Sequence, residues 1–251
     1  AFITIGQLVG VSTFSKYFKA FGFTEKTGID LPGETAPKAG VTYFEKDKMT
    51  KVNLASSSFG QSFQITPIQM ITAVNAIAND GKLMQPYVVS KTLDSEGNVV
   101  SQTQPIEKRQ VISESTSEKI MASMEQVALN GTARNAYVAG YRVGGKTGTS
   151  DKLNKPGEVA ASFVGVAPSN DPQVTVLIVV DEPEGATGGG AVAAPVAGEV
   201  IENTLTYLNI ERQYNDSEKA LLDVQVPSVT GKAVGEAQSS LEDNKFSVRV
   251  V

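Results

Sequence analysis

Hydrophobic residues recur at helical spacing in two N-terminal segments and in a longer one further along. Residues 1–10 and 13–22 each carry an apolar stripe and predict two short amphipathic helices. Thr66 is a favourable N-cap and Pro67 follows at the first helical position, where its missing N–H costs nothing. The segment from there to about Ala78 is apolar on nearly every side, which predicts a buried helix.

Alternating and continuous apolar runs predict the strands. Residues 83–93 and 98–112 are expected to pair around a turn at Asp94–Gly97. Pro86 and Pro105 confine both segments to edge positions, because proline has no N–H to donate to a neighbouring strand.

The second half predicts a helix and then a sheet. Ser113 or Ser115 caps a helix that continues to about Val127. Three strands follow, joined by polar loops that favour an antiparallel meander, at residues 141–149, 159–168 and 173–181. The third strand is apolar almost throughout and is expected at the centre of the sheet. A helix of small residues from Ala193 to about Leu208 is expected to cover one face.

Composition changes towards the C-terminal end. Residues 1–210 form the first expected domain, and residues 211–221 are polar and charged, as expected of a linker. Residues 222–251 predict strand, helix and strand at 224–229, 232–244 and 246–251. Such a unit is too small to be stable alone, so we expect it to be the first part of a second domain.

Two absences restrict the chemistry. The chain has 251 residues, no histidine and no cysteine. This excludes Ser-His-Asp and Cys-His catalysis, zinc sites built from imidazole or thiolate, and disulfides. The net charge of -5 and the lack of a basic block argue against a nucleic-acid partner. Any catalysis must therefore use hydroxyls, lysine or carboxylates.

The most distinctive segment is Val143–Ser150, with the sequence Val-Gly-Gly-Lys-Thr-Gly-Thr-Ser. Its glycines let a ligand backbone approach closely. The ammonium of Lys146 and the neighbouring hydroxyls can bind a carboxylate or a developing oxyanion. The alternative is a surface hairpin with turn glycines and a solvated lysine, and the surrounding motifs decide against it.

These motifs resemble the penicillin-binding transpeptidases, specifically the monofunctional class B branch of cell division and sporulation. The family uses a Ser-x-x-Lys box, a Ser-x-Asn box and a Lys-Thr/Ser-Gly strand. The similar stretches, in the expected order, are Thr27–Glu34, Phe59–Gln69, Gly140–Ser150 and Ser162–Pro168. Residues 222–251 resemble the start of a PASTA module.

The resemblance implies an α/β (α+β) transpeptidase fold of the penicillin-binding and β-lactamase type, with an antiparallel sheet covered by helices. Neither Ser-x-x-Lys nor Ser-x-Asn occurs in this sequence. The chain opens inside an amphipathic pattern, so we expect residue 1 to be internal to a larger protein. The missing N-terminal portion would supply the nucleophile and further strands, with Ala1 close to Lys146.

The resemblance also implies an activity. A serine attacks the D-Ala-D-Ala carbonyl of a peptidoglycan stem peptide, and an amine of a second stem takes the acyl group. β-Lactam antibiotics acylate the same serine, and neither reaction needs a metal or cofactor. The implied catalytic residues are Lys146 and Thr149. The implied substrate-binding residues are Gly145, Thr147, Gly148, Thr149 and Ser150.

Two other classes of function stay open at this point. In the first, the chain belongs to a β-lactam sensor or a β-lactamase relative. In the second, it is a non-catalytic cell-wall-binding fragment that acts through residues 222–251. The hydrolase Glu-x-x-Leu-Asn loop is not evident, and the PASTA-like segment favours the transpeptidases. The implied location is the extracytoplasmic face of the bacterial membrane. No apolar run approaches the ~20 residues of a membrane helix, so an anchor would lie outside this chain.

Overall fold

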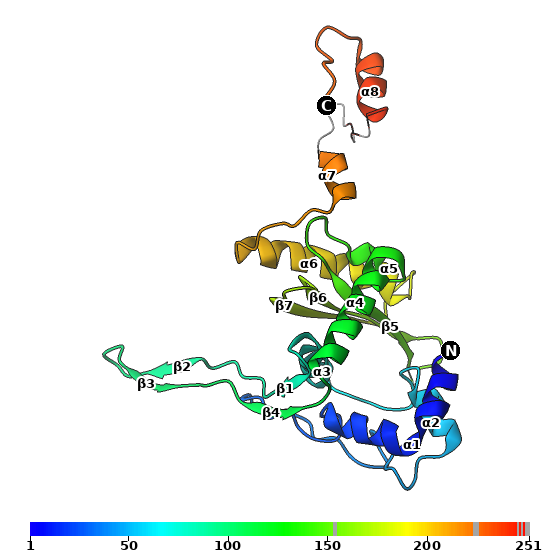
Figure 1. Ribbon diagram of the computed structural model, residues 1–251, viewed down its shortest axis with the longest axis vertical. Helices are drawn as coiled ribbons and strands as arrows, with labels where there is room; N and C mark the ends of the chain where they lie inside the picture. Colours follow the sequence, from blue (N-terminus) through cyan, green and yellow to red (C-terminus); the bar gives the residue numbers. More distant parts are fainter. Residues whose placement is uncertain (153–154, 223–225, 245, 247, 249–251) are drawn as a thin grey trace. The chain divides into compact units, whose positions relative to one another are not determined.

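The computed structural model describes residues 1–152, 155–222, 226–244, 246 and 248 (Figure 1). The chain forms two compact units, Ala1–Ile210 and Glu211–Val251. The first holds the sheet and most of the helices. Within its described residues no helix combines the length and apolarity needed to cross a membrane, and the same is true of the described part of the second unit.

A three-stranded antiparallel meander forms the centre of the first unit. Its strands are β5 (Gly144–Asp151), β6 (Val159–Ala167) and β7 (Val174–Asp181). Lys146 pairs with Val164 and Val164 with Leu177, without a bulge. The predicted meander is confirmed. The predicted central position of the third strand is wrong. The strand order is β5-β6-β7, and the apolar β7 lies at an edge of the described sheet.

Helices cover both faces of this sheet (Figure 1). Odd-numbered β6 residues face α5 (Gly189–Val192) and α6 (Ala194–Tyr207), where Phe163, Ile201 and Leu205 are fully buried. Even-numbered β6 residues face α3 (Pro67–Ala78) and α4 (Glu114–Asn130), where Val164 and Val166 pack against Val74 and Met121. The strand alternation therefore gives β6 two apolar faces, which makes it the central strand.

Two helices begin where the sequence places them. The Thr66 side chain accepts from the Gln69 N–H and Gln69 reaches back to Thr66, a capping box at the start of α3. Ser113 caps α4 by accepting from the Thr116 N–H. The predicted helix from Ala193 is also confirmed as α6, with Pro195 in its first turn.

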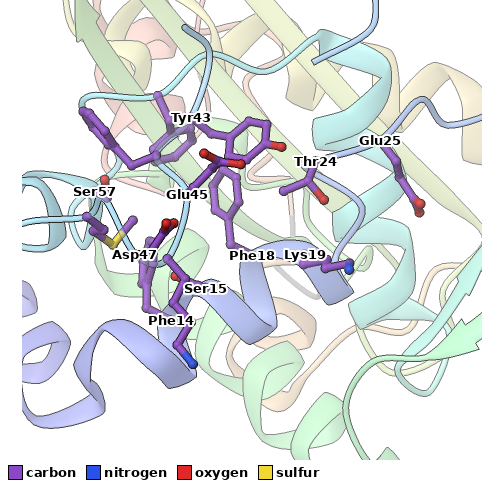
Figure 2. Close-up of a pocket in the computed structure, with 14 residues that line it drawn as sticks. Phe14, Ser15, Phe18, Lys19, Thr24, Glu25, Tyr43, Glu45, Asp47 and Ser57 are labelled. Atoms are coloured by element: carbon purple, nitrogen blue, oxygen red, sulfur yellow. The ribbon is translucent and has the colours of Figure 1, made fainter. Parts of the chain in front are cut away.

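The first helix, α1 (Phe2–Ala20), contains one kink. Gly10 has φ 76 and ψ 160, which splits it into the two predicted helical segments. The short helix α2 (Lys51–Ser57) was not expected, because residues 35–55 carry no clear apolar period; Thr50 and Asn53 form its capping box. Beside α1 lies a cavity of about 500 Å³ lined by Phe14, Phe18 and Tyr43 (Figure 2).

The predicted strand pair is confirmed around the turn but is interrupted at its prolines. β1 (Lys82–Met84) pairs with β4 (Glu107–Gln110), and β2 (Lys91–Leu93) pairs with β3 (Val99–Gln102), as two separate two-stranded sheets. The Asp30 carboxylate accepts from the N–H groups of Val88 and Val89, at 2.7 and 2.9 Å. These two hydrogen bonds hold the pKa of Asp30 below its usual value, and the one from Val89 has the larger effect.

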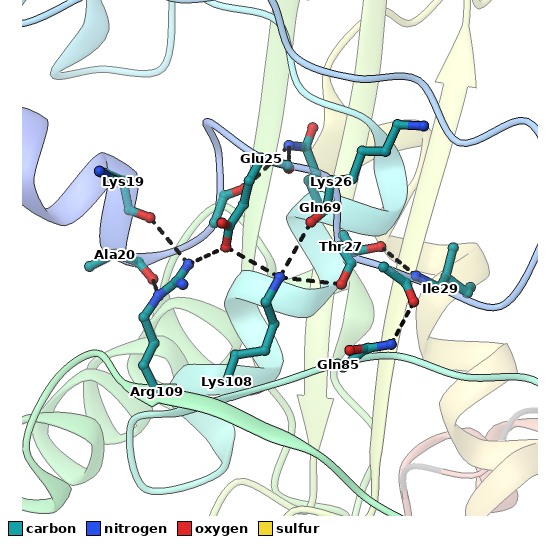
Figure 3. A network of polar contacts seen from close by, with 12 residues as sticks. Lys19, Ala20, Glu25, Lys26, Thr27, Ile29, Gln69, Gln85, Lys108 and Arg109 are labelled. Carbon is teal, nitrogen blue, oxygen red and sulfur yellow. Dashed lines mark hydrogen bonds and ion pairs between the residues drawn. The ribbon is translucent and has the colours of Figure 1, made fainter. Parts of the chain in front are cut away.

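A polar network connects the segment after α1 to the two-stranded sheet formed by β1 and β4, and to α3 (Figure 3). Arg109 and Lys108 bind the Glu25 carboxylate at 2.5 and 3.2 Å. Partial burial raises the pKa of Glu25, but the hydrogen bonds from these two cations outweigh it and leave the pKa lowered. Gln69 donates to the carbonyls of Gly22 and Glu25. The helix α3 is thereby fixed at its N-terminal end.

The second unit contains α7 (Asp216–Leu222) and α8 (Val234–Glu242). The helix expected over 232–244 is present as α8, and α7 begins within the segment expected to be a linker (211–221) and extends one residue beyond it. Residues 226–229, 246 and 248 carry no strand, and the rest of the two expected strands lies outside the described residues. The PASTA-like assignment stays a prediction.

Candidate active site

A cleft of about 750 Å³ lies along the face and outer edge of β5. One wall comes from β5–β7 and the other from the loop before α3, with Phe2 at the start of the chain also lining it. The proximity of Phe2 to Lys146 agrees with the expectation that the N-terminal residues lie near this strand. The lining residues from the sheet are Lys146, Thr147, Gly148, Thr149, Ser150, Ala160, Ser162, Leu177 and Val179.

The backbone of β5 directs alternate peptide groups away from β6. At the two ends of β5 the Lys152 N–H donates to the Glu158 carbonyl and the Ser169 N–H donates to the Arg142 carbonyl. The even-numbered peptide groups of this segment therefore form the hydrogen bonds to the β6 side. The odd-numbered peptide groups of Thr147 and Thr149 therefore point outward, since antiparallel pairing alternates. Within the described sheet β5 is an edge strand. Its outward amides and carbonyls are the groups to which an extended ligand can pair.

Side chains of the motif divide between the two faces of the strand. Lys146, Gly148 and Ser150 lie on the side of β6 that carries Ser162 and Val164. Thr147 and Thr149 lie on the side of α5. The Thr147 hydroxyl is 3.1 Å from that of Thr132. The Gly189 N–H donates to the Thr149 hydroxyl oxygen at 3.3 Å, which leaves the Thr149 O–H available as a donor.

Lys146 is exposed on the cleft side, and its ammonium donates to the Thr147 carbonyl at 2.7 Å. Among the residues that the structure describes, no carboxylate forms an ion pair with it. An ammonium that lies in a cleft without an acidic partner is free to bind an anionic ligand group.

The two motif glycines have different surroundings. Gly148 lines the cleft, and a Cβ there would come within 2.6 Å of the Ser162 hydroxyl oxygen. Gly145 is buried on the opposite face, and a Cβ there would overlap the Phe163 ring. The structure thus brings Lys146, Thr147, Gly148, Thr149 and Ser150 together at the cleft but places Gly145 in the core below α6.

A partly buried ion pair holds the entry to β5. Arg142 donates from Nε and Nη2 to the two carboxylate oxygens of Glu125, both at 2.8 Å, and the Ser169 hydroxyl donates to the same carboxylate at 2.7 Å. The Arg142 hydrogen bonds are the main cause of the lowered pKa of Glu125. This pair joins α4 to the residues before β5 and after β6.

Among the cleft residues that sequence reasoning did not assign to the site, Gln61 and Ser162 lie directly against the motif residues. Gln61 donates from Nε2 to the Thr149 carbonyl at 3.4 Å, and Ser162 faces Gly148 across the sheet. Ser162 follows from the strand register once the meander is accepted. Gln61 lies in a motif that the sequence singles out, but 88 residues separate it from Thr149, and no local pattern indicates the contact.

The family model of the penicillin-binding protein transpeptidase domain matches residues 1–202. The chain belongs to this family. Stage V sporulation protein D of Bacillus subtilis (strain 168) is 40% identical over 252 residues, which cover 96% of this chain and 38% of that protein. The peptidoglycan D,D-transpeptidase FtsI of Escherichia coli (strain K12) is 30% identical over 207 residues, covering 80% of this chain and 32% of that protein.

Solved structures agree with the family. Penicillin-binding protein 3 from Mycobacterium tuberculosis, complexed with aztreonam, has a TM-score of 0.75 at 26% identity and covers 84% of this chain and 49% of that chain. The transpeptidase domain of Burkholderia pseudomallei penicillin-binding protein 3, without ligand, has a TM-score of 0.73 at 30% identity, covering 85% and 62%. The predicted family and fold class are confirmed. The chain spans less than two fifths of the two curated relatives' length.

Proposed function

We propose that the protein to which this chain belongs cross-links peptidoglycan by serine acyl transfer, as a D,D-transpeptidase. The observation that carries the proposal is the Lys146-Thr147-Gly148 strand at an open sheet edge that lines a cleft, in a chain of this family. Relatives named for peptidoglycan D,D-transpeptidase activity, such as FtsI, support it.

In this reaction a serine hydroxyl attacks the carbonyl of the penultimate D-alanine of a stem peptide. The bond to the terminal D-alanine breaks, and that residue leaves with a proton as the free amino acid. An amine of a second stem then attacks the acyl ester and releases the serine. Because no Ser-x-x-Lys occurs between residues 1 and 251, we assign the nucleophile to a part of the protein outside this sequence.

The described residues would act on the substrate rather than as nucleophile. Within the described residues the ammonium of Lys146 has no carboxylate partner and donates only to the Thr147 carbonyl, so it is suited to the terminal carboxylate of the stem peptide. The outward N–H of Thr149 can donate to the oxyanion that develops on the attacked carbonyl, a contact typically worth ~3 kcal/mol. The free hydroxyl proton of Thr149 and the hydroxyl of Ser150 can add hydrogen bonds to the carboxylate.

β-Lactam antibiotics would acylate the same serine. The M. tuberculosis relative has been solved with aztreonam and with ampicillin, which supports this assignment. The substrate peptides lie in the cell wall, so the proposed location is the extracytoplasmic face of the bacterial membrane. The alternative of a β-lactamase relative differs in one step, the rate at which the acyl-enzyme is hydrolysed.

Labelling of the full-length protein by a fluorescent penicillin tests the proposal. We expect stoichiometric labelling of the wild type with slow release, and a loss of about 100-fold or more in labelling rate for Lys146→Ala. The stability of this variant should change by less than ~0.5 kcal/mol, because the side chain is exposed. Lys119→Ala, at another exposed lysine on α4, is the matched control and should be labelled at the wild-type rate.

Two results would contradict this assignment. Labelling of Lys146→Ala at the wild-type rate would remove Lys146 from the site. Rapid release of the label from the wild type would favour the hydrolase alternative over the transferase.

A further inference from the structure

We propose that Gln61 is a specificity-determining residue that occupies the substrate's place on β5 in the free enzyme. Its carboxamide caps the carbonyl of Thr149, and a backbone N–H of the acyl-donor peptide replaces it when the donor binds. The inference rests on the transpeptidase function proposed above and assigns a further residue to its substrate cleft.

Two carbonyls on the outer edge of β5, those of Thr147 and Thr149, already accept a hydrogen bond from a side chain. Lys146 Nζ donates to the Thr147 carbonyl at 2.7 Å, and Gln61 Nε2 donates to that of Thr149 at 3.4 Å. Uncapped edge carbonyls attract unwanted strand pairing, so capping protects the empty cleft. A peptide that pairs with this edge must displace the cap at Thr149.

The backbone around Gln61 is shaped to present it. Gly60 and Ser62, the residues on either side, have φ of 91 and 66, in the left-handed region that serine adopts only at a cost. The Gly60 N–H donates to Ser57 and the Gln61 N–H donates to Ser56, which fixes the loop to the end of α2. The side chain therefore reaches β5 from a firmly held backbone.

Antiparallel pairing identifies the N–H that competes with Gln61. In a hydrogen-bonded antiparallel pair, two residues exchange both of their N–H···O bonds. A penultimate D-alanine whose carbonyl accepts from the Thr149 N–H therefore directs its own N–H to the Thr149 carbonyl. The N–H of the attacked residue thus takes the position of the Gln61 carboxamide. At 3.4 Å the cap is at the long end of hydrogen-bond distances, so a well-placed peptide N–H can replace it.

The test compares two acyl donors with the full-length protein. One is a peptide ending in D-Ala-D-Ala, and the other is a depsipeptide in which an ester oxygen replaces the N–H of the penultimate residue. D-alanine release gives kcat and KM for each donor. In Gln61→Ala we expect the ratio of kcat/KM, amide to ester, to rise about two- to tenfold. The gain should appear as a lower KM for the amide donor, because the cap competes only before binding.

Gln61→Asn should behave like Gln61→Ala, because its shorter side chain does not reach Thr149. Gln64→Ala is the matched control: Gln64 lines the same cleft, and within the described chain its side chain forms no hydrogen bond to β5, so the ratio should stay at the wild-type value. An unchanged or lower ratio in Gln61→Ala would overturn the proposal, as would equal losses with both donors. A wild-type protein that is neither labelled by penicillin nor active on either donor would overturn the transpeptidase function and this inference together.

Discussion

Replacement of Glu125 by glutamine tests whether the ion pair at the entry to β5 stabilises the site-bearing strand. The Glu125 carboxylate accepts three hydrogen bonds of 2.7–2.8 Å, two from Arg142 and one from Ser169. The Glu125 side chain is only 13% exposed and that of Arg142 is 46% exposed. Glutamine keeps the size of the side chain and one acceptor oxygen, but it loses the negative charge. Its amide N–H₂ group would also face a group of Arg142 or Ser169 that donates a hydrogen bond in the wild type.

The structure sets the size of the effect between two limits. Removal of one member of a fully buried pair costs about 3–5 kcal/mol, and an exposed pair contributes at most ~1 kcal/mol. Arg142 can regain water on its exposed side, and one oxygen still accepts. We therefore expect Glu125→Gln to lower the free energy of unfolding by about 1–2 kcal/mol at pH 7. For a domain of this size that lowers the Tm by about 2–8 °C.

The same substitution should change the pH dependence of stability. Hydrogen bonds from Arg142, assisted by Ser169, hold the pKa of Glu125 below its usual 4.5. A carboxyl with a lowered folded-state pKa stabilises the fold above its unfolded pKa and loses that contribution as pH falls through the folded value. The difference in the free energy of unfolding between wild type and Glu125→Gln should therefore be constant near neutral pH and shrink below pH ~4.5.

Thermal and denaturant unfolding of the full-length protein from pH 7 down to pH ~3 measures both effects. Glu45→Gln is the control, because Glu45 pairs with Lys48 at 3.1 Å with both side chains well exposed. It should change stability by less than ~0.5 kcal/mol. The reasoning would be refuted if Glu125→Gln lowered the free energy of unfolding no more than Glu45→Gln does. It would also be refuted if the stability difference between wild type and Glu125→Gln stayed unchanged down to the lowest pH.

Two further predictions concern the motif strand. Thr149→Ala should reduce the acylation rate about two- to tenfold, less than Lys146→Ala does, because it removes a hydroxyl and leaves the backbone N–H. Thr149→Ser keeps the hydroxyl and should retain most of the rate. A loss of rate in Thr149→Ala as large as that in Lys146→Ala would contradict a role limited to one hydrogen bond. Gly145→Ala should lower the free energy of unfolding by about 1–3 kcal/mol, because its Cβ overlaps the buried Phe163 ring. Unchanged thermal unfolding of Gly145→Ala would contradict that packing.

Local signals in the sequence determined most of the helices and the meander. Thr66 and Pro67 specify the start of α3 because the cap and the missing N–H act within one helical turn. The strands of the meander follow from apolar runs separated by short polar loops, which leave antiparallel pairing as the natural connection. The Lys146-Thr147-Gly148 motif was likewise recognisable, because it is contiguous and lies on such a strand.

Apolar content did not determine where a strand lies in the sheet. The sequence of β7 is more continuously apolar than that of β6, yet β6 is central in the described sheet. Its small residues, such as Gly165 and Ala167, let α6 approach on one face while Val164 and Val166 pack on the other. Burial on both faces depends on which helices cover the strand, and that is a property of the packed unit.

The tertiary structure alone decided which motif residues reach the cleft and what meets them there. Gly145 and Gly148 are alike in sequence, but strand alternation places the first against Phe163 and the second beside Ser162. Gln61 meets Thr149 across 88 residues, and Glu125 meets Ser169 across 44. Hydrogen bonds between such distant positions leave no periodic trace in a sequence, because each side chain is selected by a partner that only the folded chain brings within reach.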